Sequence, residues 1–459
     1  MSQPKDQNRE LKTAVPGPRS TALRAREEAH LAPGAQGYAI MAGVAIDHAR
    51  GSTVTDVDGN TYLDFIGGIG VGALGHSHPV MVAALKDQVE KTSVGSFTSE
   101  ARVELLERLA AHAPPSEPGK KLHRLQLYSS GAEAVESALR LAKSYTGKYE
   151  FLSFWGGFHG KTMGVLSLMG STFKDKLGPM VPGSHMAPYA DCYRCPLGPG
   201  VTYPSCGIAC AEVARKQIKV TTAGELAAVI VEPMQGTAGN IVPPKEFLPA
   251  IQSIAAEAGA LFIADEMITG LGRTGTWWGV EHSGVKPDIV TVGKAFGGGF
   301  PLSGLLSTDE ICQAKPWSNP SGSSSSYGGN PLGAAAGAAA LRIIEEEELV
   351  DNARRVGAFM LAELQGFVER YPFCGHAQGA GLFLGLELVK DKKTKEPLSR
   401  HVTGRIFKEA VLRGLFTMAY SPSFRLQPAL TIDEGTARNG LAILREVFDL
   451  VEREKIWLS

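Results

Sequence analysis

The sequence predicts an α/β protein built on a mostly parallel sheet, with a smaller α+β region formed by both chain ends. Three observations support this. Between about residues 120 and 310, strand-like runs alternate with segments of helical periodicity. The strand-like runs are apolar throughout, as in strands buried on both faces of a parallel sheet. Several of them end at one polar or charged residue, and in such sheets ligands bind beyond the carboxyl ends of the strands.

The composition is that of a globular protein. A chain of 459 residues exceeds a single core, so we expect two or three packed regions. With 44% hydrophobic and 20% charged residues, it is not a largely disordered chain. A net charge of -1 gives no indication of nucleic acid or an anionic membrane as a partner. No apolar run reaches the roughly 18 residues of a membrane span, and the N-terminus lacks the apolar centre of a signal peptide. We therefore expect a cytoplasmic protein.

The chain is expected to comprise four segments. A polar N-terminal arm is followed by the first part of a small domain, a large domain and the rest of the small domain. The large domain carries a cysteine-containing insert at about residues 190–211. The four segments are residues 1–20, 21–65, 66–335 and 336–459.

The first informative element of the large domain is a strand that leads into a helix. An apolar strand runs to Tyr128, small residues follow (Ser129, Ser130, Gly131 and Ala132), and a helical pattern begins. Free N–H groups and the positive end of such a helix bind phosphate, and a glycine permits close approach. The alternative is an ordinary strand–helix turn with Ser130 as the helix cap.

The next strands each end at a residue suited to a site. Phe158 and His159 follow the second strand, where an aromatic ring could stack on a planar ligand or simply belong to the core. Glu232 and Asp265 end two further apolar strands. Buried acids are costly unless a cationic group meets them, so these two point to a ligand or to an ion pair.

Lys294 is the most chemically suggestive residue. It follows the β-branched run at 289–292, after Gly293, and three glycines stand at 297–299. Desolvation there favours the neutral amine, which is the nucleophilic form. A Schiff base with an aldehyde is the natural chemistry, and the common aldehyde cofactor is pyridoxal phosphate. The alternative is a solvated lysine beside a glycine-rich turn.

Four of the six cysteines lie close together in the sequence, as a CxxC pair and a CxxxC pair. This spacing raises a structural metal, while the alternative is a loop of reduced thiols. The short separation and the intervening proline and glycine residues argue against zinc, so we assign no metal ligands. The four residues are Cys192, Cys195, Cys206 and Cys210.

Taken together, these stretches resemble the class III (ω-type) aminotransferases among the fold-type I pyridoxal phosphate enzymes. The resemblance runs from about residue 15 to the C-terminus. The matching motifs, in the family's order, are SSGAEAVESALRLAK, GGFHGKT, VEPMQG, ADEMITGLGRTG, TVGKAFGGGFPLSG, SYGGNP and FRLQPALTI.

The resemblance implies a role for each matching residue. Lys294 forms the Schiff base with pyridoxal 5'-phosphate and then shuttles a proton, while Asp265 keeps the pyridine nitrogen protonated. Phe158 stacks on the cofactor ring, and Ser326 matches a threonine that reaches the phosphate from the partner subunit. This implies a homodimer with shared active sites, or a tetramer of such dimers. The residues that hold the phosphate are Ser130, Gly131 and Ala132.

Glu232 and Arg425 match the family's gated pair. In that pair the arginine binds the carboxylate of the keto-acid acceptor and turns to the glutamate when another substrate is bound. The alternative is a structural ion pair. Ile268 departs from the glutamine of the γ-aminobutyrate and ornithine enzymes and cannot bond the cofactor's phenolic oxygen. This departure favours a broader class of amine donors.

The expected function is transfer of an amino group from an ω-amino acid or amine, such as 4-aminobutyrate, to pyruvate or 2-oxoglutarate. The alternative is a racemase or epimerase, since these share the fold and the cofactor motifs. A third reading, a metal-binding scaffold built on the cysteine loop, has little support because every cofactor position is filled.

Overall fold

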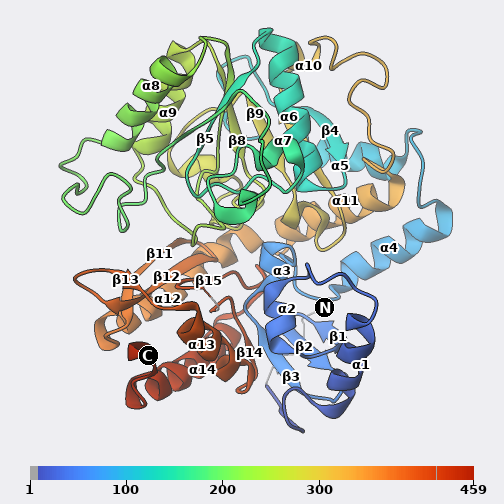
Figure 1. Ribbon diagram of the computed structural model, residues 1–459. Helices are drawn as coiled ribbons and strands as arrows, with labels where there is room; N and C mark the ends of the chain where they lie inside the picture. Colours follow the sequence, from blue (N-terminus) through green and yellow to red (C-terminus); the bar gives the residue numbers. More distant parts are fainter. Residues whose placement is uncertain (1–8, 420) are drawn as a thin grey trace. The chain divides into compact units, whose positions relative to one another are not determined.

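The computed structural model describes residues 9–419 and 421–459. It divides into two compact units (Figure 1). Unit 1 contains the residues up to Pro79 together with Asp351–Ser459, and unit 2 is Val80–Val350. The first eight residues of the expected arm lie outside the described residues, and helix α1 begins at Pro18.

A seven-stranded sheet forms the centre of unit 2, in the order β4-β10-β9-β8-β7-β5-β6. Strand β10 pairs antiparallel with both β4 and β9, whereas the other neighbouring pairs are parallel. The expected α/β fold with a mostly parallel sheet is confirmed. The strands are β4 (Arg124–Tyr128), β5 (Glu150–Phe154), β6 (Ser184–Ala187), β7 (Leu226–Val231), β8 (Leu261–Asp265), β9 (Ile289–Val292) and β10 (Ser303–Ser307).

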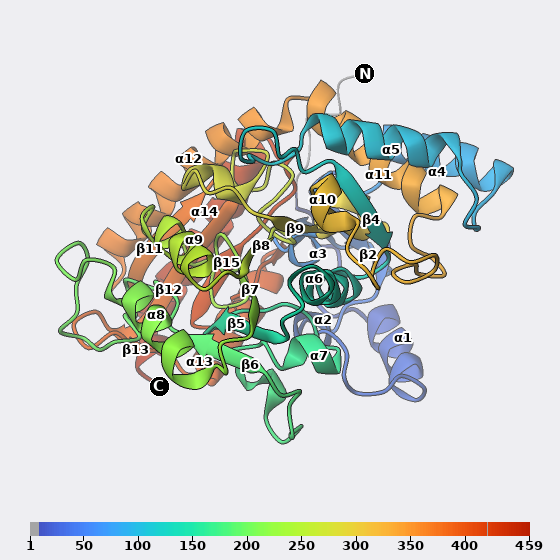
Figure 2. The ribbon, with the colours of Figure 1, turned by 90° about the horizontal axis from the view of Figure 1, so that it is seen from above.

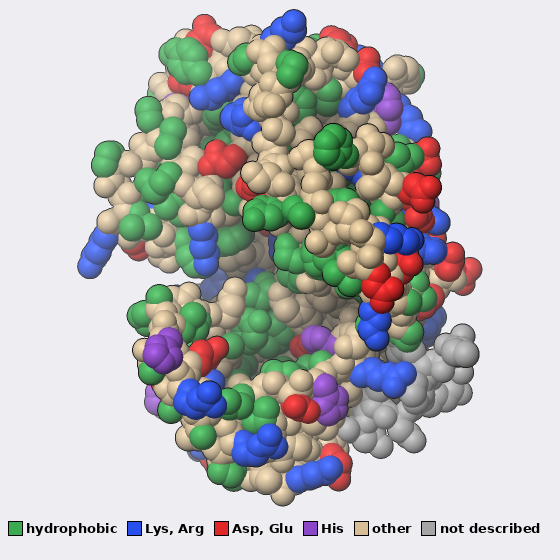
Figure 3. Space-filling model, turned by 90° about the vertical axis from the view of Figure 1, so that its right-hand side faces the viewer, with side chains coloured by type: hydrophobic (Ala, Val, Ile, Leu, Met, Phe, Trp, Pro, Cys, Tyr) green, Lys and Arg blue, Asp and Glu red, His purple; other side chains and the backbone are tan. Residues whose placement is uncertain are grey.

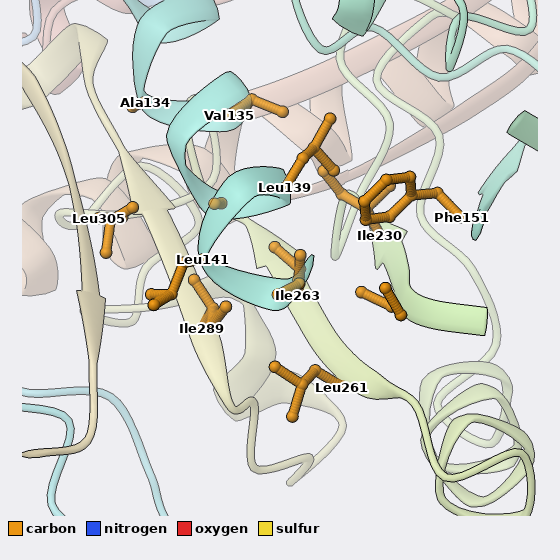
Figure 4. Close-up of a cluster of buried hydrophobic side chains, with 14 of the residues drawn as sticks. Ala134, Val135, Leu139, Leu141, Phe151, Ile230, Leu261, Ile263, Ile289 and Leu305 are labelled. Carbon is orange, nitrogen blue, oxygen red and sulfur yellow. The ribbon is translucent and has the colours of Figure 1, made fainter. Parts of the chain in front are cut away.

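Helix α6 (Gly131–Thr146) packs against this sheet because its apolar residues recur at helical spacing. Figure 2 views α6 along its axis, beside the strands. Its side chains Val135, Leu139 and Leu141 belong to one buried cluster with Ile230, Ile263 and Ile289 from the sheet (Figure 4). Burying each large apolar side chain stabilises the fold by about 1.5–3 kcal/mol, so this face holds the start of α6 firmly at the sheet.

Further helices of unit 2 lie outside the sheet. Helix α11 packs on α5, and its small residues allow close approach: a Cβ at Gly337 would lie 2.8 Å from Leu105. These helices are α4 (Pro79–Lys91), α5 (Glu100–Ala111), α7 (Met163–Leu166), α8 (Ala209–Thr221), α9 (Phe247–Glu257), α10 (Asp309–Cys312) and α11 (Pro331–Glu346).

Unit 1 joins the two ends of the chain, since β14 pairs in parallel with β3. Its strands are β1 (Ile46–Arg50), β2 (Thr53–Asp56), β3 (Thr61–Asp64), β11 (Cys374–Ala380), β12 (Phe383–Asp391), β13 (Glu396–Pro397), β14 (Leu415–Phe416) and β15 (Ser423–Leu426). Its helices are α1 (Pro18–Glu28), α2 (Gly37–Ala42), α3 (Gly67–Gly70), α12 (Leu349–Arg370), α13 (Arg400–Val411) and α14 (Glu434–Arg453).

Within the described residues, no helix has the length and apolar character needed to cross a membrane. On the face drawn in Figure 3, basic and acidic side chains are interspersed among apolar ones.

Candidate active site

The candidate site lies at one edge of the seven-stranded sheet. Strands β5, β7, β8 and β9 are parallel neighbours, so their carboxyl ends meet there. Asp265 is the last residue of β8, Glu232 follows β7, and Phe158 follows β5 after a short turn. Lys294 follows β9 after Gly293.

Asp265 is the most firmly held side chain of the site. It is buried, and its Oδ1 accepts hydrogen bonds from the backbone N–H of Met267 and the hydroxyl of Thr291, both at 3.1 Å. Its Oδ2 lies 2.6 Å from Nδ1 of His159. These contacts fix the orientation of the carboxylate inside the protein.

His159 is a functional neighbour to which the sequence assigned no role. Burial alone lowers the pKa of its imidazole, but the hydrogen bond to Asp265 and the charges of Asp265 and Glu232 raise that pKa overall. The carboxylate of Asp265 therefore favours the protonated form of His159. The motif GGFHGKT places His159 beside Phe158 in sequence, but not beside Asp265.

Glu232 holds the loop that carries Phe158. Its Oε1 accepts the N–H of Phe158 at 2.9 Å, and its Oε2 accepts the N–H of Gly236 at 3.0 Å. Burial raises the pKa of this carboxyl, while the nearby His159 counteracts the shift. The predicted partner Arg425 lies on β15 of unit 1, paired with Gly385 of β12. The pairing of Glu232 with Arg425 remains a prediction.

Lys294 sits at a backbone position of unusual geometry. It is half-buried, begins a 3₁₀ turn (Lys294–Gly297), and has a left-handed φ of 46°. A non-glycine residue in that region carries strain that the surroundings must offset, and such strain is common at functional sites. A Cβ on the preceding Gly293 would lie 2.6 Å from Sδ of Met267, so a larger residue there would displace the Met267 side chain.

The predicted phosphate-binding turn begins α6. Ser130 caps the helix in a reciprocal capping box with Glu133. The next two residues, Gly131 and Ala132, occupy the first helical positions, where backbone N–H groups have no carbonyl partner within the helix. A Cβ at Gly131 would lie 3.1 Å from Sδ of Met267. Met267 thus packs between this turn and the residue before Lys294.

The remaining predicted residues lie nearby in unit 2. Phe158 is half-buried and contacts Phe173 edge-on, with ring centroids 5.6 Å apart. Ser326 is exposed in the loop before α11. Its neighbour Ser325 donates a hydrogen bond to Glu133 at 3.1 Å, which brings this loop to the start of α6.

Glu266 is a second carboxylate that the sequence reasoning did not assign. It is buried, and it accepts the N–H groups of Gly279 and Val280 together with the hydroxyl of Thr269. Burial raises its pKa to about 7 despite these donors. Its contacts hold the segment after Trp278 in place, so its role is structural support next to Asp265.

The four clustered cysteines are free thiols that line one small cavity. Burial, with the neighbouring thiols, raises the pKa of Cys192 to about 11. Burial also raises the pKa of Cys210 to about 11. No group of three or more His, Cys, Asp or Glu side chains is arranged to hold a metal ion within residues 9–419 and 421–459.

These residues fit a phosphorylated pyridine aldehyde. The buried Asp265 carboxylate suits a protonated ring nitrogen, the start of α6 suits a phosphate, and the amine of Lys294 suits an aldehyde. A Cβ at Gly131 or at Gly293 would crowd the side chain of Met267, so these two glycines let the start of α6 and the end of β9 lie close to it. A lysine and an acid at adjacent strand ends of this sheet define a fold-type I pyridoxal phosphate enzyme.

Comparison with known proteins gives the particular family. The Aminotransferase class-III family model matches residues 34–448. The chain therefore belongs to the class-III aminotransferases, and its cofactor is pyridoxal 5'-phosphate. The predicted family and cofactor are confirmed.

Relatives in this family have different activities. The chain is 34% identical to a leucine/methionine racemase of Thermococcus litoralis, over 89% of this chain and 91% of the relative. It is 35% identical to a 5-aminovalerate aminotransferase of Pseudomonas aeruginosa, over 88% and 93%. The PLP-bound structure of an amine transaminase from an uncultivated Pseudomonas species superimposes with a TM-score of 0.83 at 30% identity, covering 92% of this chain and 98% of that one.

Proposed function

We propose that this aminotransferase moves an amino group from an ω-amino acid or amine, such as 4-aminobutyrate, to pyruvate or 2-oxoglutarate. The observation that carries the proposal is the buried Asp265, held 2.6 Å from His159, at the sheet edge that also bears Lys294. The similarity to a 5-aminovalerate aminotransferase supports an ω-amino acid as the donor.

Each residue has a defined task in this proposal. Pyridoxal 5'-phosphate supplies an aldehyde that exchanges for an amine and a ring that accepts electrons from the substrate carbon. Lys294 would hold the cofactor through Nζ, and its amine, when free, would accept the proton that leaves the substrate Cα. Asp265 would pair with the ring nitrogen, and His159 keeps the carboxylate oriented. Phe158 covers one face of the ring.

The proposed phosphate contacts come from two subunits. Ser130, Gly131 and Ala132 hold the phosphate in one subunit, and Ser326 of the partner subunit reaches it across a homodimer. Exposed apolar side chains on unit 2 support an interface: Phe97 is 92% exposed and Tyr327 is 64% exposed. We place the dimer in the cytoplasm, in keeping with six unpaired cysteine thiols.

Glu232 and Arg425 are proposed to select between the two substrates. The arginine binds the carboxylate of the keto acid through two parallel hydrogen bonds. When a substrate without that carboxylate enters, the arginine turns to Glu232. Both oxygens of the buried Glu232 accept a backbone N–H, at 2.9 and 3.0 Å. Each carboxylate oxygen has a further lone pair, which could accept a guanidinium N–H.

Arg425→Ala is expected to raise the KM of the keto acid far more than that of a monoamine donor. Losing a charged hydrogen bond to a buried ligand costs about 2–5 kcal/mol, or roughly 30- to several-thousand-fold in affinity. Arg425→Lys should not restore binding fully because an ammonium lacks the planar fork. Steady-state kinetics of both half-reactions measure this, with Arg438→Ala on the surface of unit 1 as the control. Equal damage to both substrates would make Arg425 a structural residue.

Racemisation is the second candidate function, and the 34% identity to a leucine/methionine racemase favours it. Both reactions begin with loss of the Cα proton and differ in the carbon that is reprotonated. A screen of donors and acceptors separates them. Transamination converts the cofactor to its amine form with amine alone and needs a keto acid to recover. Loss of optical purity without a keto acid, with the cofactor absorbance unchanged, would instead establish a racemase.

A further inference from the structure

The carboxylate of Glu133 connects two parts of the candidate site. Its Oε2 accepts the backbone N–H groups of Ser129 at 3.1 Å and Ser130 at 3.0 Å. Its Oε1 accepts the hydroxyl of Ser325 at 3.1 Å. One side chain therefore holds the turn before α6 with one oxygen and the loop before α11 with the other.

The loop is fastened to the same region at two further points. The hydroxyl of Tyr128, at the end of β4, donates to the carbonyl of Ser323 at 2.7 Å. Nη1 of Arg140, on α6, donates to the carbonyl of Gly322 at 2.9 Å. The chain just before Ser326 thus takes its position from β4 and α6, and the contact nearest to Ser326 is the one between Ser325 and Glu133.

Glu133 and a bound phosphate need not compete for the N–H groups of Gly131 and Ala132, whereas Glu133 already accepts the N–H and the hydroxyl of Ser130. The carboxylate uses the N–H groups of Ser129 and Ser130, whereas Gly131 and Ala132 offer theirs at the first positions of the helix. A phosphate bound to Gly131 and Ala132 therefore orders the turn without breaking the hydrogen bonds of Glu133. The ordered turn then restrains the Glu133 carboxylate, which holds Ser325.

We propose that the Glu133–Ser325 hydrogen bond couples the two cofactor sites of the homodimer, so that cofactor bound in one subunit tightens binding in the other. This rests on the proposed function, in which Ser326 of the partner subunit contacts the phosphate. Cofactor in one site orders that subunit's own turn, and through Glu133 and Ser325 it orders the Ser326 that the subunit lends to the other site. The second site then loses less conformational entropy when it binds the cofactor, because its Ser326 is already ordered. Its affinity is therefore higher, which is positive cooperativity.

The test is titration of the cofactor-free dimer with pyridoxal 5'-phosphate, followed by the absorbance of the bound cofactor. Wild type is expected to bind cooperatively, with the second site about 5-fold or more tighter than the first, the lower end of typical coupling. Ser325→Ala should make the two sites equal and independent. The capping box of Ser130 and Glu133 stays intact in this variant, so its thermal unfolding without cofactor should match wild type.

Ser324→Ala is the matched control, because the hydroxyl of the exposed Ser324 bonds only within the loop, to the carbonyl of Ser321. It should keep wild-type cooperativity. Independent sites in wild type, unchanged cooperativity in Ser325→Ala, or an equal loss in Ser324→Ala would each overturn the coupling. A monomeric enzyme, or a Ser326→Ala variant with unchanged cofactor affinity, would instead refute the shared site and the coupling with it.

Discussion

The Lys294→Ala enzyme is expected to lose turnover altogether, together with the absorbance band of covalently bound cofactor. The reason is geometric. Lys294 lies directly beyond β9, at the same sheet edge as the buried Asp265, and begins a turn in which its own φ is left-handed. The turn Lys294–Gly297 contains no second lysine, and alanine can neither bind the aldehyde nor carry the proton.

Absorbance and single-turnover assays measure both losses. Lys286→Ala is a suitable control, because Lys286 stands just before the same strand and its ammonium pairs with Glu117 at 3.4 Å. That variant should behave as wild type. A Lys294→Ala protein that kept the band and its activity would show that another residue binds the cofactor, and the assignment of the whole site would be wrong.

Asp265→Asn is expected to keep the cofactor bound but to slow the chemical step by several orders of magnitude. Asparagine preserves the shape of the side chain and removes the charge that holds a proton on the ring nitrogen. The same change should lower the pKa of His159, since the hydrogen bond and charge of Asp265 are what raise it. Two readouts follow: the single-turnover rate and the titration of the His159 imidazole.

The rate loss decides the role of Asp265. A decrease of less than about tenfold, equivalent to about 1.4 kcal/mol, would be too small for the group that stabilises charge on the cofactor. Thermal unfolding of the variant, compared with wild type, distinguishes a lost charge from a disturbed fold. A normal fold with a severe rate loss is the expected combination.

The sequence predicted those parts of the site that follow from local patterns. An apolar strand that ends at a single charged residue is visible in the sequence, and this identified Asp265 and Lys294 as neighbours at a sheet edge. The turn at Ser130 was also predictable, because strand, small residues and helix follow one another directly. The α/β fold came from the same alternation of strand and helix.

Pairings between distant segments could not be predicted in this way. His159 and Asp265 are 106 positions apart, and their contact depends on the order of strands in the sheet. Glu133 and Ser325 are 192 positions apart, and nothing in a serine-rich run marks one serine as a partner. The four cysteines are a similar case, since their spacing alone did not show that they line one cavity.

Chemical trapping tests most directly whether Lys294 carries the cofactor. Borohydride reduces the bond between a lysine amine and the cofactor aldehyde to a stable amine, and peptide mapping by mass spectrometry then locates the modified residue. We expect one modified peptide, with the cofactor on Nζ of Lys294. Modification of a different lysine, or none after reduction of the cofactor-loaded enzyme, would contradict it.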